Sequence, residues 1–120
     1  MTDLMYHEKI LSHYHAPQHY GLLESFDEEV SIENALCGDA VTVRLKFAGD
    51  CIHDSSFIHQ GCVISRAAAS MLMEYIQGKS KEEIRGLHLD FLIKNLLVSS
   101  ITPARMPCVT LALAAVQRVV

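Results

Sequence analysis

Apolar and polar residues alternate over residues 41–47, as they do in a β-strand with one buried face. The turn-forming sequence Ala48-Gly49-Asp50 comes next, and residues 51–59 then predict a returning strand. Residues 25–33 predict a third strand, because Phe26, Val30 and Ile32 are spaced for one face. We therefore expect a hairpin with one further strand.

After these strands, the sequence predicts helices. Residues 62–77 are rich in good helix formers, and Gly78 stands where a helix-ending glycine belongs. Ser80 and Glu83 have the spacing of a capping box, which predicts a short helix after them. The apolar spacing of residues 4–14 and of residues 89–98 predicts two more helices.

The last helix is predicted over residues 107–120, with Pro107 at its first position. An alternative start at Thr102, with Pro103 first, would make Pro107 a kink. Strands come first and helices afterwards, without strand–helix alternation. We therefore expect an α+β fold in which a small antiparallel sheet of about three strands is covered by helices.

Composition fits one domain over residues 1–120, since half of the 120 residues are apolar. Ten Lys and Arg against fourteen Asp and Glu give a net charge of −4, the wrong sign for a nucleic-acid binder. The longest apolar run, residues 109–116, is too short to cross a membrane, and the first residues do not resemble a secretory signal. We expect a cytoplasmic protein whose four cysteines are reduced thiols.

Three of these cysteines and one carboxylate form a candidate metal site. Cys37 and Asp39 flank Gly38 between two extended segments, Cys62 opens the helix over residues 62–77, and Cys108 opens the last helix. Each stands at a predicted element end, so we expect the four to converge on one exposed site at the edge of the sheet. A helix N-terminus favours the thiolate, and thiolates with a carboxylate are donors for zinc or an iron–sulfur cluster. No Cys-x-x-Cys pair is present, so spacing alone leaves open whether these cysteines bind metal or are buried apolar residues.

Three motifs carry a resemblance to a known family. Residues 34–39, Asn-Ala-Leu-Cys-Gly-Asp, resemble the NPxCGD signature of the IscU/NifU-type iron–sulfur scaffold proteins. Residues 60–72, which begin Gln-Gly-Cys-Val-Ile-Ser, resemble the GCxIS helix start of that family. Residues 105–112, Arg-Met-Pro-Cys-Val-Thr-Leu-Ala, resemble the RxxCxxLAW stretch of its SufU branch. The motifs occur in the family's order over nearly the whole chain.

This resemblance implies a scaffold rather than an enzyme. Such a protein receives sulfur as persulfide from a cysteine desulfurase, assembles a transient [2Fe-2S] cluster from iron, electrons and that sulfur, and passes the cluster to acceptor proteins. It implies that Cys37, Asp39, Cys62 and Cys108 bind the cluster or a metal, and that the three cysteines are possible persulfide acceptors. The carboxylate of Asp39 would keep the cluster labile.

The two branches of the family leave an alternative function. In the SufU branch zinc occupies these ligands and the protein is a sulfurtransferase, and Arg105, three residues before Cys108, is typical of that branch. That branch also has an insertion between its second and third cysteines, for which 45 residues are too few. The IscU branch has His where this chain has Pro107, and an LPPVK segment where it has residues 101–105, which weighs against the chaperone that reads LPPVK.

Other residues have simpler interpretations. Cys51 matches no ligand position, and His13, His15 and His19 are expected at the surface. His59, three residues before Cys62, could reach the site from the returning strand. We expect Arg105 to influence the site without binding metal, by pairing with Asp39 when that carboxylate is off the metal.

Overall fold

A computed structural model describes residues 15–16, 19–34, 38–61, 63–87 and 106–120. Of residues 63, 64 and 106–109 the backbone alone is described. The helices expected over residues 4–14 and 89–98 lie outside the described residues.

Three strands form one antiparallel sheet in the order β1 (Glu28–Asn34), β2 (Asp39–Ala48) and β3 (Cys51–Gln60). The predicted hairpin is confirmed, with Gly49 at φ 62° in its turn. The third strand is confirmed too, but it begins at Glu28 rather than at residue 25. Asp27 explains this start, because its carboxylate accepts a 2.7 Å hydrogen bond from the Phe47 backbone N–H at the irregular end of β2.

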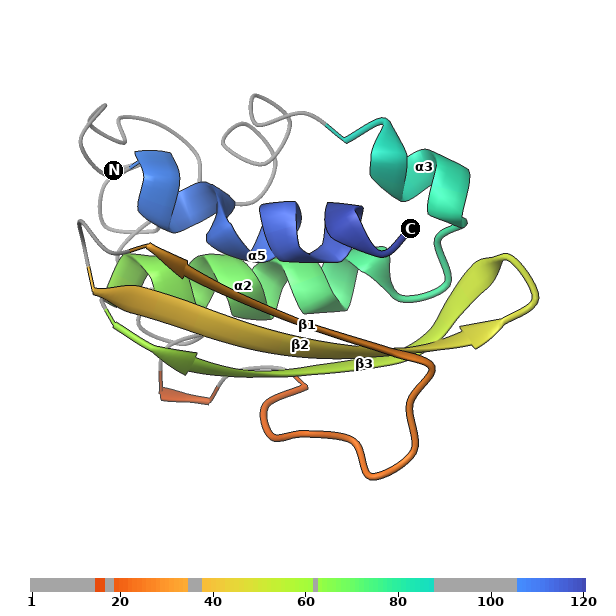
Figure 1. Cartoon of the computed structure of the whole chain (residues 1–120), viewed down its shortest axis with the longest axis horizontal. Helices are drawn as coiled ribbons and strands as arrows, with labels where there is room; N and C mark the ends of the chain where they lie inside the picture. Colours follow the sequence, from red (N-terminus) through yellow and green to blue (C-terminus); the bar gives the residue numbers. More distant parts are fainter. Residues whose placement is uncertain (1–14, 17–18, 35–37, 62, 88–105) are drawn as a thin grey trace, which may run out of the picture.

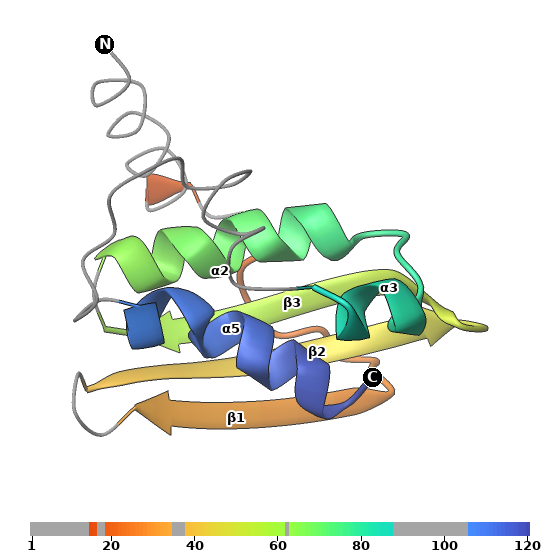
Figure 2. The ribbon, with the colours of Figure 1, turned by 90° about the horizontal axis from the view of Figure 1, so that it is seen from above.

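Two long helices cover one face of this sheet (Figures 1 and 2). Helix α2 (Val63–Ile76) packs on β3, and helix α5 (Met106–Arg118) packs on β1, β2 and α2. Between them in sequence lies the short helix α3 (Lys81–Arg85), whose predicted capping box is present. The α+β class, with an antiparallel sheet covered by helices, is therefore confirmed.

The start of the last helix differs slightly from the expectation. Pro107 is the second residue of α5 and not the first. The alternative start at Thr102 depends on residues 102–105, which lie outside the described residues.

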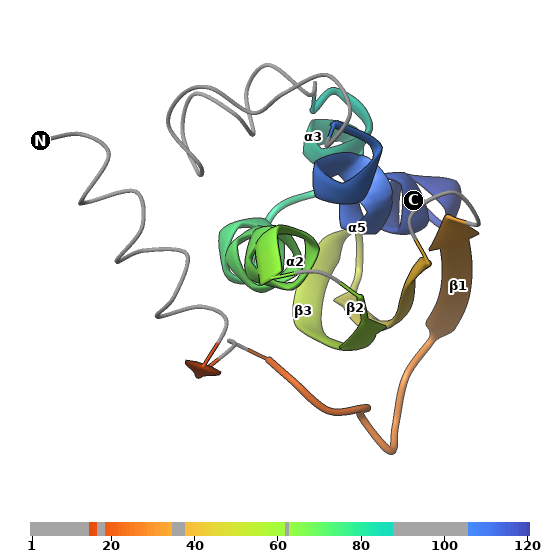
Figure 3. The same cartoon turned by 90° about the vertical axis from the view of Figure 1, so that its left-hand side faces the viewer.

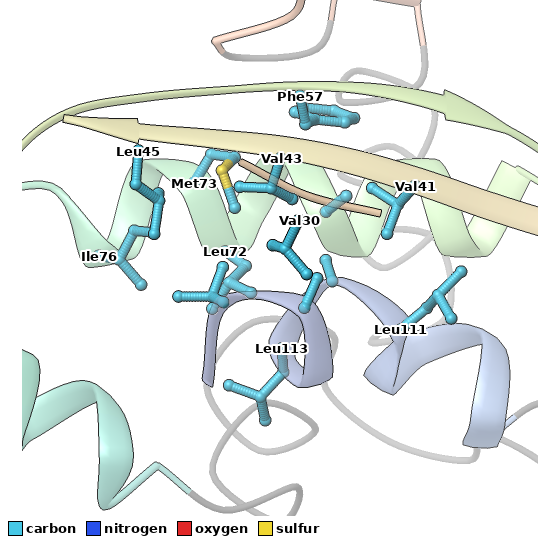
Figure 4. Packing of buried hydrophobic residues seen from close by; sticks show 14 of the residues in the cluster. Val30, Val41, Val43, Leu45, Phe57, Leu72, Met73, Ile76, Leu111 and Leu113 are labelled. Atoms are coloured by element: carbon cyan, nitrogen blue, oxygen red, sulfur yellow. The ribbon is translucent and has the colours of Figure 1, made fainter. Parts of the chain in front are cut away.

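The hydrophobic core lies between the sheet and the two long helices (Figure 4). Alternation places Val41, Val43 and Leu45 on the covered face of β2, where each is at most 2% exposed. Side chains from all three strands and both long helices meet there, among them Val30, Phe57, Leu72, Met73, Ile76, Leu111 and Val116. The described part of α5 contributes to this core on several sides, so its nearly continuous apolar sequence reflects burial.

A strap formed by residues 19–27 runs over the opposite face of the sheet (Figure 3). The Leu23 N–H donates to Ser56 Oγ at 2.9 Å, and the Leu23 carbonyl accepts from Arg44 Nη1 at 2.8 Å. The Arg44 guanidinium also lies 4.2 Å from the centre of the Phe26 ring. The polar face of β2 is therefore only partly open to solvent.

His19 is better anchored than the sequence suggested. Its Nδ1 lies 3.0 Å from the carbonyl oxygen of Ser55 and 3.7 Å from the carboxylate of Asp54. Its backbone extends the sheet edge, because Phe57 N–H donates to the His19 carbonyl at 3.1 Å. The side chain of His19 is 26% exposed, so it is a partly buried surface histidine, whereas His15 is exposed and His13 lies outside the described residues.

Neighbouring residues on β3 test this arrangement. Phe57 is fully buried and its ring meets the Tyr20 ring edge-on at 5.2 Å, whereas Ile58 is 39% exposed on the other face. We expect Phe57→Ala to lower the free energy of unfolding by about 3–5 kcal/mol, because a large core side chain is lost. We expect Ile58→Ala to cost less than about 1 kcal/mol. Urea denaturation measures both, and equal losses would contradict the assignment of the two faces.

Candidate metal centre

Four element ends that contain or adjoin the predicted ligands in the sequence meet at one end of the molecule (Figures 1 and 2). Strand β2 begins there at Asp39 and strand β3 ends there at Gln60. Helix α2 begins beside them at Val63, and helix α5 at Met106. Both helices therefore direct the positive ends of their dipoles to this place, and neither has an acidic residue in its first turn.

Asp39 is the predicted ligand whose side chain the structure describes, and it is buried. It is 1% exposed, although we expected an exposed site at the sheet edge. Asp39 has the same orientation in β2 as Val41 and Val43, so its carboxylate lies on the face that the helices cover. The expectation of exposure is wrong for this residue because the alternation of β2 continues to its first position.

Gly61 is what makes room for this carboxylate. The register pairs Ala40 with Gln60, so Asp39 and Gly61 lie opposite each other at the end of the β2–β3 ladder. A Cβ atom added to Gly61 would lie 1.8 Å from Asp39 Oδ1 and 2.9 Å from its Cα. The φ of Gly61 is also +138°, which L side chains rarely adopt. Glycine before Cys62 is thus required by the position of Asp39.

The other predicted site residues are placed only in part. Cys37, Cys62 and Arg105 lie outside the described residues. In the sequence Cys37 is two residues before Asp39, and Cys62 stands between Gly61 and Val63. Cys108 is the third residue of α5, at the same end of the molecule. Among the residues that the structure describes, no three His, Cys, Asp or Glu side chains form a group that could hold a metal.

His59 stands beside Asp39 on the covered face. It pairs with Val41 across the β2–β3 ladder, one position inward from the Asp39–Gly61 pair. Within the described part of the chain, its buried Nε2 atom has no hydrogen-bond partner. Burial lowers the pKa of His59 below its ordinary value, the Asp39 carboxylate opposes this shift, and the Arg66 guanidinium adds to it.

Arg66 and Tyr20 border the same region, and the sequence did not point to either. The Arg66 guanidinium lies 4.5 Å from the centre of the Tyr20 ring, so it links α2 to the strap around the edge of β3. A hollow of about 350 Å³ lies beside this contact, lined by Tyr20, Ala40, Thr42, Ile58, His59 and Gln60. Nothing in the periodicity marks Arg66, because its partner is 46 positions away.

Cys51 is placed far from this end of the sheet. It is the first residue of β3, whereas Gly61 directly follows the last, and ten strand residues span about 30 Å. Its side chain is partly exposed beside Ser80, with which its backbone forms an isolated bridge.

The donors that are described suit a metal such as zinc or iron. The buried carboxylate of Asp39 and the partly buried imidazole of His59 lie on the same face of the sheet, two and three residues from Cys37 and Cys62 in the sequence. In the part of the chain that the structure describes, Nε2 of His59 has no hydrogen-bond partner. Oxygen, nitrogen and thiolate ligands together are a usual donor set for these metals.

No described helix is long and apolar enough to span a membrane.

Comparison with known proteins gives a consistent result. The sequence matches the family described as NifU-like N terminal domain over residues 5–120. Over 83 residues it is 39% identical to the iron–sulfur cluster assembly scaffold protein IscU of Streptococcus pyogenes serotype M1. That alignment covers 69% of this chain and 52% of the streptococcal protein, so the chain matches about half the length of that relative.

Two further relatives cover almost the whole chain. The zinc-dependent sulfurtransferase SufU of Bacillus subtilis is 31% identical, over 97% of this chain and 89% of its own length. A crystal structure from Fervidobacterium islandicum, of a candidate iron–sulfur cluster assembly scaffold for the SUF system, superposes with a TM-score of 0.75. It is 26% identical and the match covers 98% of each chain. The chain therefore belongs to the NifU-like N-terminal domain family, which includes the IscU and SufU proteins of iron–sulfur cluster assembly.

Proposed function

We propose that this chain is an iron–sulfur cluster assembly scaffold, with Cys37, Asp39, Cys62 and Cys108 as the ligands of a transient [2Fe-2S] cluster. The observation that carries the proposal is the buried carboxylate of Asp39 over Gly61, the residue before Cys62. A fully buried carboxylate is costly unless it is paired or binds a metal. Its place where β2 begins, β3 ends and α2 and α5 begin, close in sequence to the three cysteines, supports a shared centre.

The carboxylate suits a cluster that is made to be passed on. Three thiolates hold iron strongly, whereas a carboxylate is a harder ligand that exchanges more readily. An acceptor protein could therefore displace Asp39 first and then take the cluster. A protein that stores a cluster would be better served by a fourth thiolate.

Sulfur reaches the site from a cysteine desulfurase in this proposal. A scaffold thiolate attacks the outer sulfur of the desulfurase persulfide, the sulfur–sulfur bond breaks, and the desulfurase keeps its thiolate. Cys37, Cys62 and Cys108 are each candidates for the attacking group, and helix N-termini favour the thiolate at the last two.

A zinc-bound sulfurtransferase is the second candidate function. It is favoured by the likeness to the zinc-dependent sulfurtransferase of Bacillus subtilis and by Arg105, three residues before Cys108. Zinc would then occupy the same four ligands, and the persulfide would be relayed to another protein. In either function we propose that Arg105 pairs with Asp39 when the carboxylate leaves the metal.

Anaerobic reconstitution with iron, cysteine, a cysteine desulfurase and a thiol reductant tests the proposal, where the reductant supplies the two electrons that convert each persulfide sulfur to sulfide. We expect a brown protein with charge-transfer absorption and about two irons per chain, as a [2Fe-2S] cluster requires. Cys37→Ser, Cys62→Ser and Cys108→Ser should each bind less than half of that iron, whereas Cys51→Ser, the matched control, should bind as much as the unaltered chain. A colourless product with one zinc per chain would support the sulfurtransferase, and no bound metal would contradict both functions.

Replacing Asp39 tests the role of the carboxylate. We expect the Asp39→Ala protein to assemble a cluster and to lose it severalfold more slowly, because three thiolates then face an acceptor without an easily displaced ligand. The decay of visible absorption in the presence of a chelator gives the rate. Faster loss would show that Asp39 is an ordinary stabilising ligand.

Gly61→Ala tests the close approach to Asp39. The added methyl group must displace the carboxylate, so we expect zinc affinity to fall about 10–100-fold, the usual effect of disturbing the residues that orient a ligand. Competition with a coloured chelator measures this affinity. Gly78→Ala is the control, because Gly78 also has a positive φ, of 81°, but nothing within 4 Å of an added Cβ. Equal affinities in the two variants would contradict the role of Gly61.

A further inference from the structure

One ring nitrogen of His59 is the starting point for a further inference about the metal site. Its Nε2 atom is buried and has no hydrogen-bond partner in the described part of the chain. Buried polar atoms in native proteins nearly always have a partner, and one without a partner requires an explanation. A nitrogen of a neutral imidazole is also the commonest nitrogen ligand for metals in proteins.

The sheet register places the side chain of His59 on the same face as that of Asp39. His59 pairs with Val41, whose side chain lies on the covered face with that of Asp39. Residues that pair in an antiparallel ladder have side chains on the same face, and diagonal neighbours lie about 7–8 Å apart at their Cα atoms. Asp39 and His59 are such diagonal neighbours, close enough for one ion to lie between a carboxylate and an imidazole.

The surrounding charges allow a cation at this position. Asp39 is the acidic group that acts on His59, and Arg66 is the basic one. The Arg66 guanidinium lies over the Tyr20 ring, 4.5 Å from its centre, at the edge of β3. Of these two charged groups, the Asp39 carboxylate has the larger effect on the imidazole of His59.

We propose that Nε2 of His59 is a further ligand of the metal that Asp39 binds, and that the two side chains exchange at one coordination position. This inference rests on the proposed function, which supplies the three cysteine thiolates. Three thiolates, one carboxylate and one imidazole are five donors for a tetrahedral metal, which takes four. When the carboxylate leaves, the imidazole completes a Cys₃His set, a common closed arrangement for zinc. No electron is transferred in this exchange.

The metal would then have two coordination states. With Asp39 bound, the metal has an easily displaced ligand and can be passed on. With His59 bound, the metal is held while Asp39 is free to take another partner. Slow metal loss from an Asp39→Ala protein then depends on His59, so the two substitutions are not additive.

Zinc release from four variants tests this dependence. Zn²⁺-loaded unaltered, His59→Ala, Asp39→Ala and doubly substituted proteins are mixed with an excess of a coloured chelator. We expect the Asp39→Ala protein to release zinc most slowly, and the double variant to release it at least about tenfold faster than Asp39→Ala. His53→Ala is the matched control, because His53 is exposed on the same strand, and it should release zinc like the unaltered protein.

A second measurement needs no substitution at His59. Ring-nitrogen NMR of the ¹⁵N-histidine-labelled protein should show the Nε2 resonance of His59 shifting when Zn²⁺ is added, with His53 unchanged. If zinc binds but that resonance stays in place, or the double variant behaves like Asp39→Ala, the inference is overturned and the proposed function stands. If the unaltered chain binds neither zinc nor a cluster, the proposed function fails and this inference fails with it.

Discussion

The carboxylate of Asp39 occupies the space that a side chain on residue 61 would fill. Because of this close approach, residue 61, which lies opposite Asp39 at the end of the sheet, must be a glycine. The close approach buries the carboxylate to 1% exposure, so that the charge must be met by a partner or a metal. In the sequence, Asp39 is two residues after Cys37 and Gly61 directly precedes Cys62, so this steric contact joins two chain positions that are close to predicted ligands.

The register of the β2–β3 hairpin maintains this contact. A shift by one residue would turn Asp39 to the opposite face, and Val41, Val43 and Leu45 would turn with it. The buried core residues therefore fix the orientation of the polar residue at the end of their strand. The one irregularity in this pairing, between Lys46 and Phe47, lies near the turn and away from Asp39.

The sequence predicted the elements well where periodicity and turn chemistry agree. Alternation over residues 41–47, the glycine at 49 and the Ser80 capping box each have a local cause, and each is found in the structure. The burial of Asp39 was not predicted, because its motif was interpreted as a loop between extended segments rather than as the first position of β2. Sequence could not show the contact of Arg66 with Tyr20 or the unpartnered nitrogen of His59, since both depend on how α2 and β3 pack.

X-ray absorption of the zinc-loaded chain tests most directly whether thiolates and Asp39 share one centre. The account predicts a shell of sulfur atoms at about 2.3 Å together with a lighter oxygen or nitrogen atom at about 2.0–2.2 Å. The lighter shell should change when Asp39 is replaced by alanine. A shell of four sulfur atoms alone, or of oxygen and nitrogen atoms without sulfur, would contradict a centre built from cysteines and this carboxylate.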